Sequence, residues 1–265
     1  MSITKLEFRD GHIPESLTWS TMVLISKSRG GYRGIEIVEV IWKVCALIVN
    51  NKLRNAINLK DTLNGFIKGR GVGTAIMEAK LVQQLAEIVH EPILQVFIDM
   101  RKAYDSLDRG RCMEIIRGYG LGPKLQRLIH RLWDKQEVVS KSGKFFGSLF
   151  RTERGVTQGD PVSPTIFNIV VDVVVREVLL KSCGPQKSHH GFVWLRGKHN
   201  ICFHADDGQI AGHNLIWVQT TLTEMVRMFK RVVLQTFLRK NKAMVCLPGF
   251  VGPNREQRHT RGEQW

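Results

Sequence analysis

The adjacent acids Asp206 and Asp207 constrain the fold more than any other feature of the sequence. They follow an apolar run and precede Gly208. Neighbouring carboxylates repel each other and resist burial. Asp-Gly after an apolar run is typical of a β-hairpin, so we expect the pair of acids at a strand-to-strand turn. Asp99 ends a second apolar run. Three carboxylates at two strand ends indicate a site for hard divalent cations, of the kind that performs phosphoryl or nucleotidyl transfer.

The rest of the pattern mixes helices and strands without an alternating βαβ order. Helical spacing of apolar residues predicts a helix over 74–90 with Thr74 as its N-cap, followed by the strand that ends at Asp99. A long apolar helix with proline in its first turn is expected over 161–180, and a hairpin over 136–153. This order favours an α+β fold, and 265 residues can bury a substantial core. Further patterns predict strands over 21–25 and 243–247 and helices over 38–57, 110–118, 124–135 and 221–234.

The chain carries 39 lysines and arginines against 24 acids, a formal net charge of +15. This excess favours a polyanionic partner, first of all nucleic acid, and a basic surface that serves only solubility is the alternative. Five scattered cysteines without a CxxC pair indicate reduced thiols in an intracellular setting, which in a eukaryote includes the nucleus. The cysteines and histidines between 183 and 202 fit no usual zinc spacing. No stretch of membrane-spanning length lacks charges, so we expect no membrane residence.

The segment 97–109 surrounds the first acid. Asp99 ends its strand where the carboxylate can reach a metal ion, and the backbone carbonyl of Met100 offers another oxygen ligand. Asp105 and Asp108, taken alone, are interpreted as turn and cap residues.

The segment 154–168 lies between the two carboxylate elements and is pinned by glycines and prolines. Gln158 offers both a donor and an acceptor to a base or sugar edge. The helix that follows can direct backbone N–H groups at an anion, and a loop that is rigid only to begin a helix is the alternative.

Together these segments resemble motifs A, B and C of a reverse transcriptase, in the branch of non-LTR retrotransposons and group II introns. The matching strings begin at Phe97 (Phe-x-Asp-x-x-x-Ala-Tyr-Asp), Gly155 (Gly-Val-Thr-Gln-Gly-Asp-Pro-x-Ser-Pro) and His204 (His-Ala-Asp-Asp-Gly). Upstream, Tyr32-Arg-Gly-Ile and Gly65-Phe-x-x-Gly-Arg resemble fingers motifs of that branch. The resemblance spans roughly residues 8–250.

The resemblance implies a right-hand polymerase in which an antiparallel palm sheet is backed by helices. Fingers are expected over about 1–90 and 110–153, and the palm over about 91–109 and 154–250. The thumb is expected to be absent, and residues 251–265 to form a loose tail.

The resemblance also implies the roles of site residues. Asp99, Asp206 and Asp207 would be the catalytic acids, holding two Mg²⁺ ions, or Mn²⁺, with the carbonyl of Met100. Tyr104 would lie under the sugar of the incoming nucleotide, which Gln158 and Gly159 would contact. Lys27 and Arg33 would bind its triphosphate. Lys240 would act as a general acid, or it is only part of a basic face.

Several residues depart from the family pattern. His204 replaces the usual aromatic Tyr or Phe before Ala-Asp-Asp, Ser26 replaces a common proline, and Phe237 and Asn241 replace Asn and Thr in the segment that resembles motif D.

The implied function is an RNA-directed DNA polymerase of a retroelement, which extends a DNA primer with dNTPs on an RNA template. A catalytically decayed fragment that binds nucleic acid without turnover is the alternative. A third interpretation, a nucleotide-binding loop at Gly69–Gly73, lacks the Gly-Lys-Ser/Thr ending. The sequence leaves the oligomeric state open.

Overall fold

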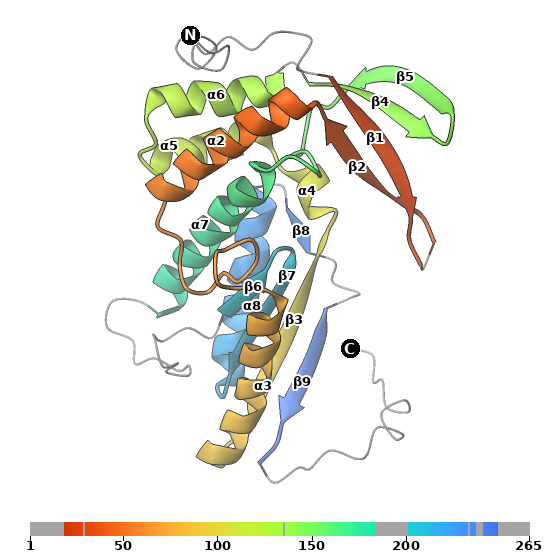
Figure 1. The fold of residues 1–265 in the computed structure, drawn as a ribbon. Helices are drawn as coiled ribbons and strands as arrows, with labels where there is room; N and C mark the ends of the chain where they lie inside the picture. Colours follow the sequence, from red (N-terminus) through yellow and green to blue (C-terminus); the bar gives the residue numbers. More distant parts are fainter. Residues whose placement is uncertain are drawn as a thin grey trace.

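The fold is α+β, as the sequence predicts, and it contains two β-sheets at different heights of the molecule (Figure 1). The computed structural model describes residues 19–28, 30–134, 136–183, 201–232, 234–236 and 241–248. The strands are β1 (Trp19–Ser26), β2 (Tyr32–Val38), β3 (Ile93–Arg101), β4 (Glu137–Ser142), β5 (Phe145–Arg151), β6 (Ile201–His204), β7 (Asp207–Gly212), β8 (Gln235–Thr236) and β9 (Lys242–Cys246). The helices are α2 (Val40–Ala56), α3 (Val72–Val89), α4 (Ala103–Ser106), α5 (Arg109–Gly118), α6 (Pro123–Asp134), α7 (Ser163–Cys183) and α8 (Leu215–Arg231).

The upper sheet has the strand order β2-β1-β4-β5. The hairpins β1–β2 and β4–β5 are antiparallel, and the parallel pairing of β1 with β4 joins them. Both hairpins project from the same side of the molecule, at the upper right of Figure 1. The upper sheet therefore combines two segments that are far apart in the sequence.

The lower sheet is built on β3, which pairs with β7 on one edge and with both β8 and β9 on the other, all antiparallel. Successive side chains of a strand point to opposite faces. Val96, Ile98 and Met100 accordingly lie in the main core, which α7 and α8 complete, whereas Ile93 packs on the other face against α3. Gln95 continues that second face, where its amide donates to the carbonyl of Ala79 in α3 at 3.3 Å.

Most predicted elements are present, with shifted ends. Asp108 caps α5 as predicted, because its carboxylate accepts the N–H of Arg111 at 2.8 Å. The prediction of Thr74 as a helix cap is wrong: α3 begins at Val72, and the Thr74 hydroxyl accepts the N–H of Gly71 from inside the first turn. Within the part of the chain that the structure describes, no helix is both long and apolar enough to span a membrane.

Candidate active site

The predicted strand-to-strand turn is present in the β6–β7 hairpin, with Asp206 in the turn and Asp207 directly after it. His204 and Asp207 are the pair nearest the turn, so Ala205 and Asp206 form a two-residue loop. Ala205 has a φ of 54°, the positive value that tight hairpin turns require of their first loop residue.

Only Asp206 lies in the turn, because Asp207 and Gly208 are the first residues of β7. Gly208 pairs with Phe203 of β6, and a Cβ at Gly208 would lie 2.3 Å from a ring atom of Phe203. The glycine is therefore required by close packing of this ring rather than by the turn itself. This corrects the expectation that both acids lie in the turn.

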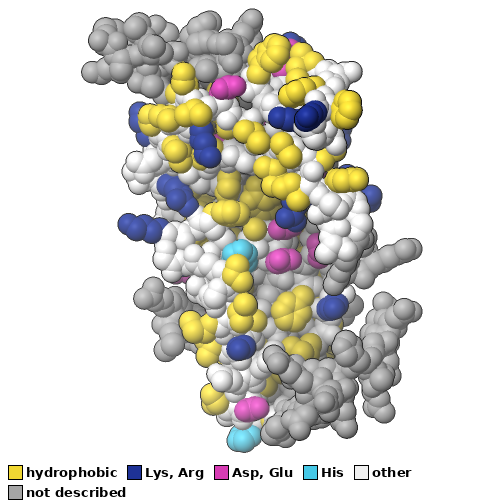
Figure 2. All heavy atoms as spheres, turned by 45° about the vertical axis from the view of Figure 1, so that its right-hand side comes forward, with side chains coloured by type: hydrophobic (Ala, Val, Ile, Leu, Met, Phe, Trp, Pro, Cys, Tyr) yellow, Lys and Arg dark blue, Asp and Glu magenta, His cyan; other side chains and the backbone are white. Residues whose placement is uncertain are grey.

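Asp99 lies directly opposite Asp207 in the antiparallel pairing of β3 with β7. Opposite residues of such a pair point to the same face, with Cβ atoms about 5 Å apart, and like charges there destabilise a sheet. Asp206 adjoins this pair in the hairpin loop. Figure 2 shows acidic side chains grouped near the middle of one face of the molecule, beside a histidine and between hydrophobic patches. The acids are thus brought together at a local cost to the fold.

The donor set suits a cation of the magnesium type, because carboxylate oxygens are its preferred protein ligands. Within the described residues, no three acidic, histidine or cysteine side chains come close enough together to hold one metal ion. Magnesium is commonly bound through one or two carboxylates, with water and substrate phosphates completing its shell. The facing pair Asp99 and Asp207, with Asp206 beside it, fits this open kind of site and does not form a closed cage.

Asn241 holds the backbone of Asp99. On the outer edge of β3, pairing with β9 ends at Phe97 and Lys242, and pairing with β8 begins at Met100. In the gap between them, Asn241 Oδ1 accepts the Asp99 N–H at 3.1 Å. Sequence reasoning identified Asn241 only as a departure from the family pattern, because nothing local links two residues so far apart in the chain.

Tyr104 lies in α4, close to the hairpin. Its ring stacks on Phe167 of α7 with centroids 4.9 Å apart and planes at 12°. Burial, and then the charge of Asp206, raise the pKa of the Tyr104 phenol. Its hydroxyl is buried and has no hydrogen-bond partner among the described residues. Tyr104 is therefore a fixed, neutral ring beside the acids.

The loop of motif B is tied to the segment that follows Asp99. The N–H of Val156 donates to the Tyr104 carbonyl at 2.9 Å, and the Gln158 amide donates to Asp105 Oδ1 at 2.9 Å. Asp105, interpreted from sequence as a turn residue, thus orients Gln158.

The same loop is tied to β2 of the upper sheet. The N–H of Glu36 donates to the Gln158 carbonyl at 2.8 Å. Gly159 has a φ of 125°, and a Cβ there would lie 2.2 Å from the Glu36 carbonyl oxygen. Gln158 and Gly159 therefore lie at the junction of the upper sheet with the acids' surroundings.

A buried polar network supports this junction and was missed by sequence reasoning. Glu36 Oε2 accepts from Ser20 Oγ at 3.0 Å and from Gln136 Nε2 at 2.6 Å, and Gln136 also donates to Thr157 Oγ1 at 2.6 Å. Burial raises the pKa of Glu36, against the opposing effects of the Ser20 hydrogen bond and the nearby Arg109 charge. A lone acid in the alternating stretch Ile35-Glu36-Ile37 is the only signal the sequence offers for it.

Of the remaining predicted residues, Arg33 and Met100 lie in the two sheets and Lys27 lies in the connection from β1 to β2. Lys27 and Arg33 are exposed at the connected ends of β1 and β2, where the Lys27 N–H donates to the Gly31 carbonyl at 3.0 Å. Met100 is in β3 with its side chain buried. Lys240 and the predicted tail 251–265 lie outside the described residues.

An antiparallel sheet that presents facing acids is tied by a glycine-containing loop to a second sheet with exposed cations, an arrangement consistent with the palm and fingers fold. The chain belongs to the family "Reverse transcriptase (RNA-dependent DNA polymerase)", which matches residues 25–261.

Relatives agree with this assignment. The chain is 24% identical over 245 residues to the "Retrovirus-related Pol polyprotein from type-1 retrotransposable element R2" of Nasonia vitripennis, covering 90% of this chain and 23% of the relative. It is 25% identical over 174 residues to the type-2 element R2DM polyprotein of Drosophila melanogaster, covering 63% of this chain and 16% of that protein. The chain thus spans less than a quarter of these relatives.

Solved structures agree in fold. Apo telomerase from Candida tropicalis, truncated from its C-terminal domain, superposes with a TM-score of 0.63 and 14% identity, covering 92% of this chain and 52% of that one. Telomerase from the same organism in complex with a fragment of telomeric RNA gives a TM-score of 0.61 and 15% identity, covering 89% and 42%.

Proposed function

We propose that this domain copies RNA into DNA by transferring deoxynucleotides to the 3′-hydroxyl of a primer. The observation that carries the proposal is the facing of Asp99 and Asp207 across β3 and β7, with Asp206 in the adjoining turn. A fold gains nothing from opposing like charges, so a function that needs them is the simplest reason for their placement.

Asp99, Asp206 and Asp207 would hold two Mg²⁺ ions, together with the Met100 carbonyl. When bound, such ions activate an attacking hydroxyl and neutralise charge on the departing pyrophosphate. Asn241 fixes the backbone from which the Asp99 carboxylate projects. The protein's own contribution is thus to keep acidic oxygens in place where substrate phosphates complete the site.

The neighbouring residues would bind the nucleotide. The Tyr104 ring, held flat on Phe167, would support the sugar and leave no room for a 2′-hydroxyl. Gln158 and Gly159 would contact the incoming nucleotide.

Lys27 and Arg33 would pair with the triphosphate of the nucleotide, because charge-assisted bonds to phosphate are strong. Lys240 would assist the departure of pyrophosphate.

RNA template, DNA primer and dNTP are the proposed partners, and the net charge of +15 supports binding of polyanions. The telomerase neighbour in complex with RNA is consistent with an RNA partner. An intracellular location remains part of the proposal.

Primer extension on poly(rA)–oligo(dT) with Mg²⁺ or Mn²⁺ tests the function. We expect measurable extension by the wild-type chain, none by Asp206→Asn, and wild-type extension by Asp108→Asn. The last variant is a matched control, because asparagine also caps helices and Asp108 lies outside the site. Binding of the duplex without extension by the wild type would instead support the catalytically decayed alternative.

A further inference from the structure

Phe66 occupies a backbone conformation that phenylalanine rarely adopts. Its φ is 57°, in the left-handed region, where a bulky side chain is an outlier. The side chain is 47% exposed, so burial of the ring does not explain the conformation. Strain of this kind persists only where the surroundings enforce it, and it is concentrated at functional sites.

Hydrogen bonds from two helices hold Phe66 in place. Asn168 of α7 donates from Nδ2 to the carbonyl of Gly65 at 2.7 Å in a buried position. Arg54 of α2 donates from its guanidinium to the carbonyl of Phe66 itself. The backbone on both sides of the Phe66 Cα is therefore fixed, and the ring is presented from a rigid support.

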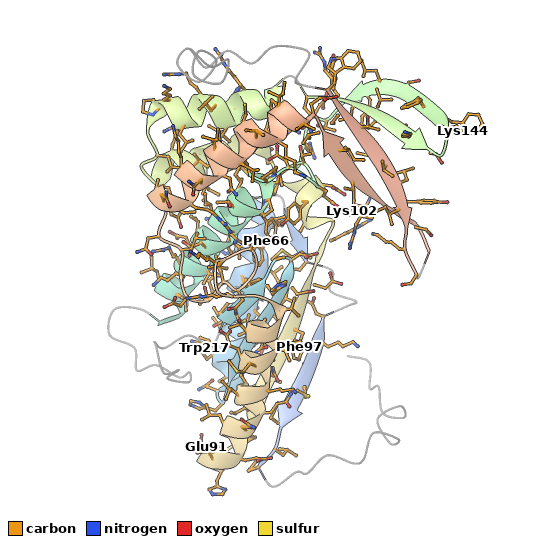
Figure 3. All side chains as sticks on the ribbon, viewed as in Figure 1. Phe66, Glu91, Phe97, Lys102, Lys144 and Trp217 are labelled. Atoms are coloured by element: carbon orange, nitrogen blue, oxygen red, sulfur yellow. The ribbon has the colours of Figure 1, made fainter. Side chains whose placement is uncertain are left out.

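The same segment lies against the hairpin that carries the acids. It forms a short parallel bridge to β6. A Cβ at Gly65 would lie 2.5 Å from the backbone nitrogen of Ala205, the residue before Asp206. Figure 3 shows Phe66 in the loop above α3, which covers the face of the lower sheet on which Asp99 lies. Phe66 therefore directly follows the residue that packs against the turn bearing Asp206, at the edge of the candidate active site.

We propose that the Phe66 ring stacks on a nucleobase of the single-stranded nucleic acid held in this site, an inference that rests on the proposed function. An aromatic face beside cations is how proteins hold single strands of any sequence. Lys68, exposed two residues later, supplies a cation for the phosphate of the same strand. The conformational strain at Phe66 is the local cost of placing the ring there.

The test uses variants that separate the effect of losing the aromatic ring from the effect of relieving the backbone strain. Phe66→Asn and Phe66→Gly remove the ring and relieve the left-handed strain, because both residues tolerate a positive φ. Phe66→Tyr retains the ring. Ile88→Asn is the control, since Ile88 is 73% exposed in the last turn of α3, near the start of β3 and away from its catalytic end.

Affinity for a fluorescent primer–template duplex with a single-stranded overhang is measured for each variant, beside its melting temperature. We expect Phe66→Asn and Phe66→Gly to bind about tenfold more weakly while melting at the wild-type temperature or above, because a stacked base contributes roughly that much. Phe66→Tyr and Ile88→Asn should bind like the wild type. Unchanged affinity in Phe66→Asn, or a loss of affinity that follows a loss of thermal stability, would overturn the proposal.

Binding is measured without turnover, so the two proposals fail separately. If the wild type extends a primer and Phe66→Asn binds normally, the stacking role is wrong and the polymerase function stands. If the wild type does not extend but Phe66→Asn binds weakly, the stacking role stands for a protein that only binds nucleic acid.

Discussion

Asn241 Oδ1 accepts the backbone N–H of Asp99 at 3.1 Å, at the point where β9 has ended and β8 has not yet begun. A side chain thus supplies the hydrogen bond that a neighbouring strand would otherwise make. This bond fixes the backbone of β3 at Asp99, from which the carboxylate projects.

Loss of this bond should slow catalysis rather than weaken binding. We expect Asn241→Leu, similar in size but without an acceptor, to lower kcat about tenfold or more with little change in KM, because a displaced catalytic group loses rate steeply. Asn241→Thr retains an acceptor oxygen and should recover part of the rate. Single-turnover extension kinetics measure both, and a KM effect with unchanged kcat would contradict the positioning role.

Tyr104 carries a buried hydroxyl that has no hydrogen-bond partner among the described residues. We expect Tyr104→Phe to raise the free energy of unfolding by about 1 kcal/mol, because it removes an unsatisfied polar group.

Tyr104→Phe should leave the preference for deoxynucleotides over ribonucleotides unchanged, because it keeps the ring. Tyr104→Ala should raise ribonucleotide incorporation about tenfold or more by opening the space beneath the sugar. Competitive incorporation of dNTP and rNTP measures the preference, and equal discrimination by Tyr104→Ala would exclude a gating role.

Gly159 cannot carry a Cβ without moving the Glu36 backbone, which would lie 2.2 Å away. We expect Gly159→Ala to destabilise the fold by about 1–3 kcal/mol through this clash and its φ of 125°, and to raise KM for the nucleotide. Gly73 in α3 is the control, since a Cβ there meets nothing within 4 Å and alanine favours a helix by about 1 kcal/mol. Urea denaturation of both variants makes the comparison, and equal stability would show that the loop adapts.

Glu36 should make stability depend on pH. Burial is the main cause of its raised pKa, so the folded state retains a proton that the unfolded chain releases near pH 4.5. Its stabilising contribution is complete below pH 4.5 and is lost as pH rises through the raised folded value. Glu36→Gln keeps an acceptor for Ser20 and Gln136 but cannot ionise. It should therefore be more stable than the wild type at pH 8, with the difference vanishing toward pH 4. Denaturation across this range measures the effect, and a difference that grows toward acid pH would contradict it.

Local patterns account for much of the fold. The hairpin at Asp206, the cap at Asp108 and the long helix α7 follow from apolar spacing, turn chemistry and proline placement, which act within a few residues. The spacing that predicts α3 fails only at its first turn, where Thr74 satisfies Gly71 from within the helix.

Long-range relationships could not be predicted in this way. The strand β2 buries Glu36 and exposes Ile37, the reverse of what their polarities predict, so its orientation depends on pairing with distant segments. The Asn241 bond to Asp99 and the approach of Gly65 to Ala205 depend on how distant segments pack. The motif resemblance implied that Asp99, Asp206 and Asp207 bind metal together, whereas the pairing of Asp99 opposite Asp207 required the structure.

The central claim is that Asp99 of β3, Asp207 of β7 and Asp206 in the turn before β7 share paired metal ions. The most direct measurement is anomalous diffraction from crystals with Mn²⁺, primer–template and a non-hydrolysable dNTP analogue. We predict two manganese peaks about 2.1 Å from carboxylate oxygens of Asp99 and Asp206 or Asp207, with nucleotide phosphates completing their shells. A bound nucleotide without manganese at these acids, or carboxylates turned away from one another, would contradict the claim.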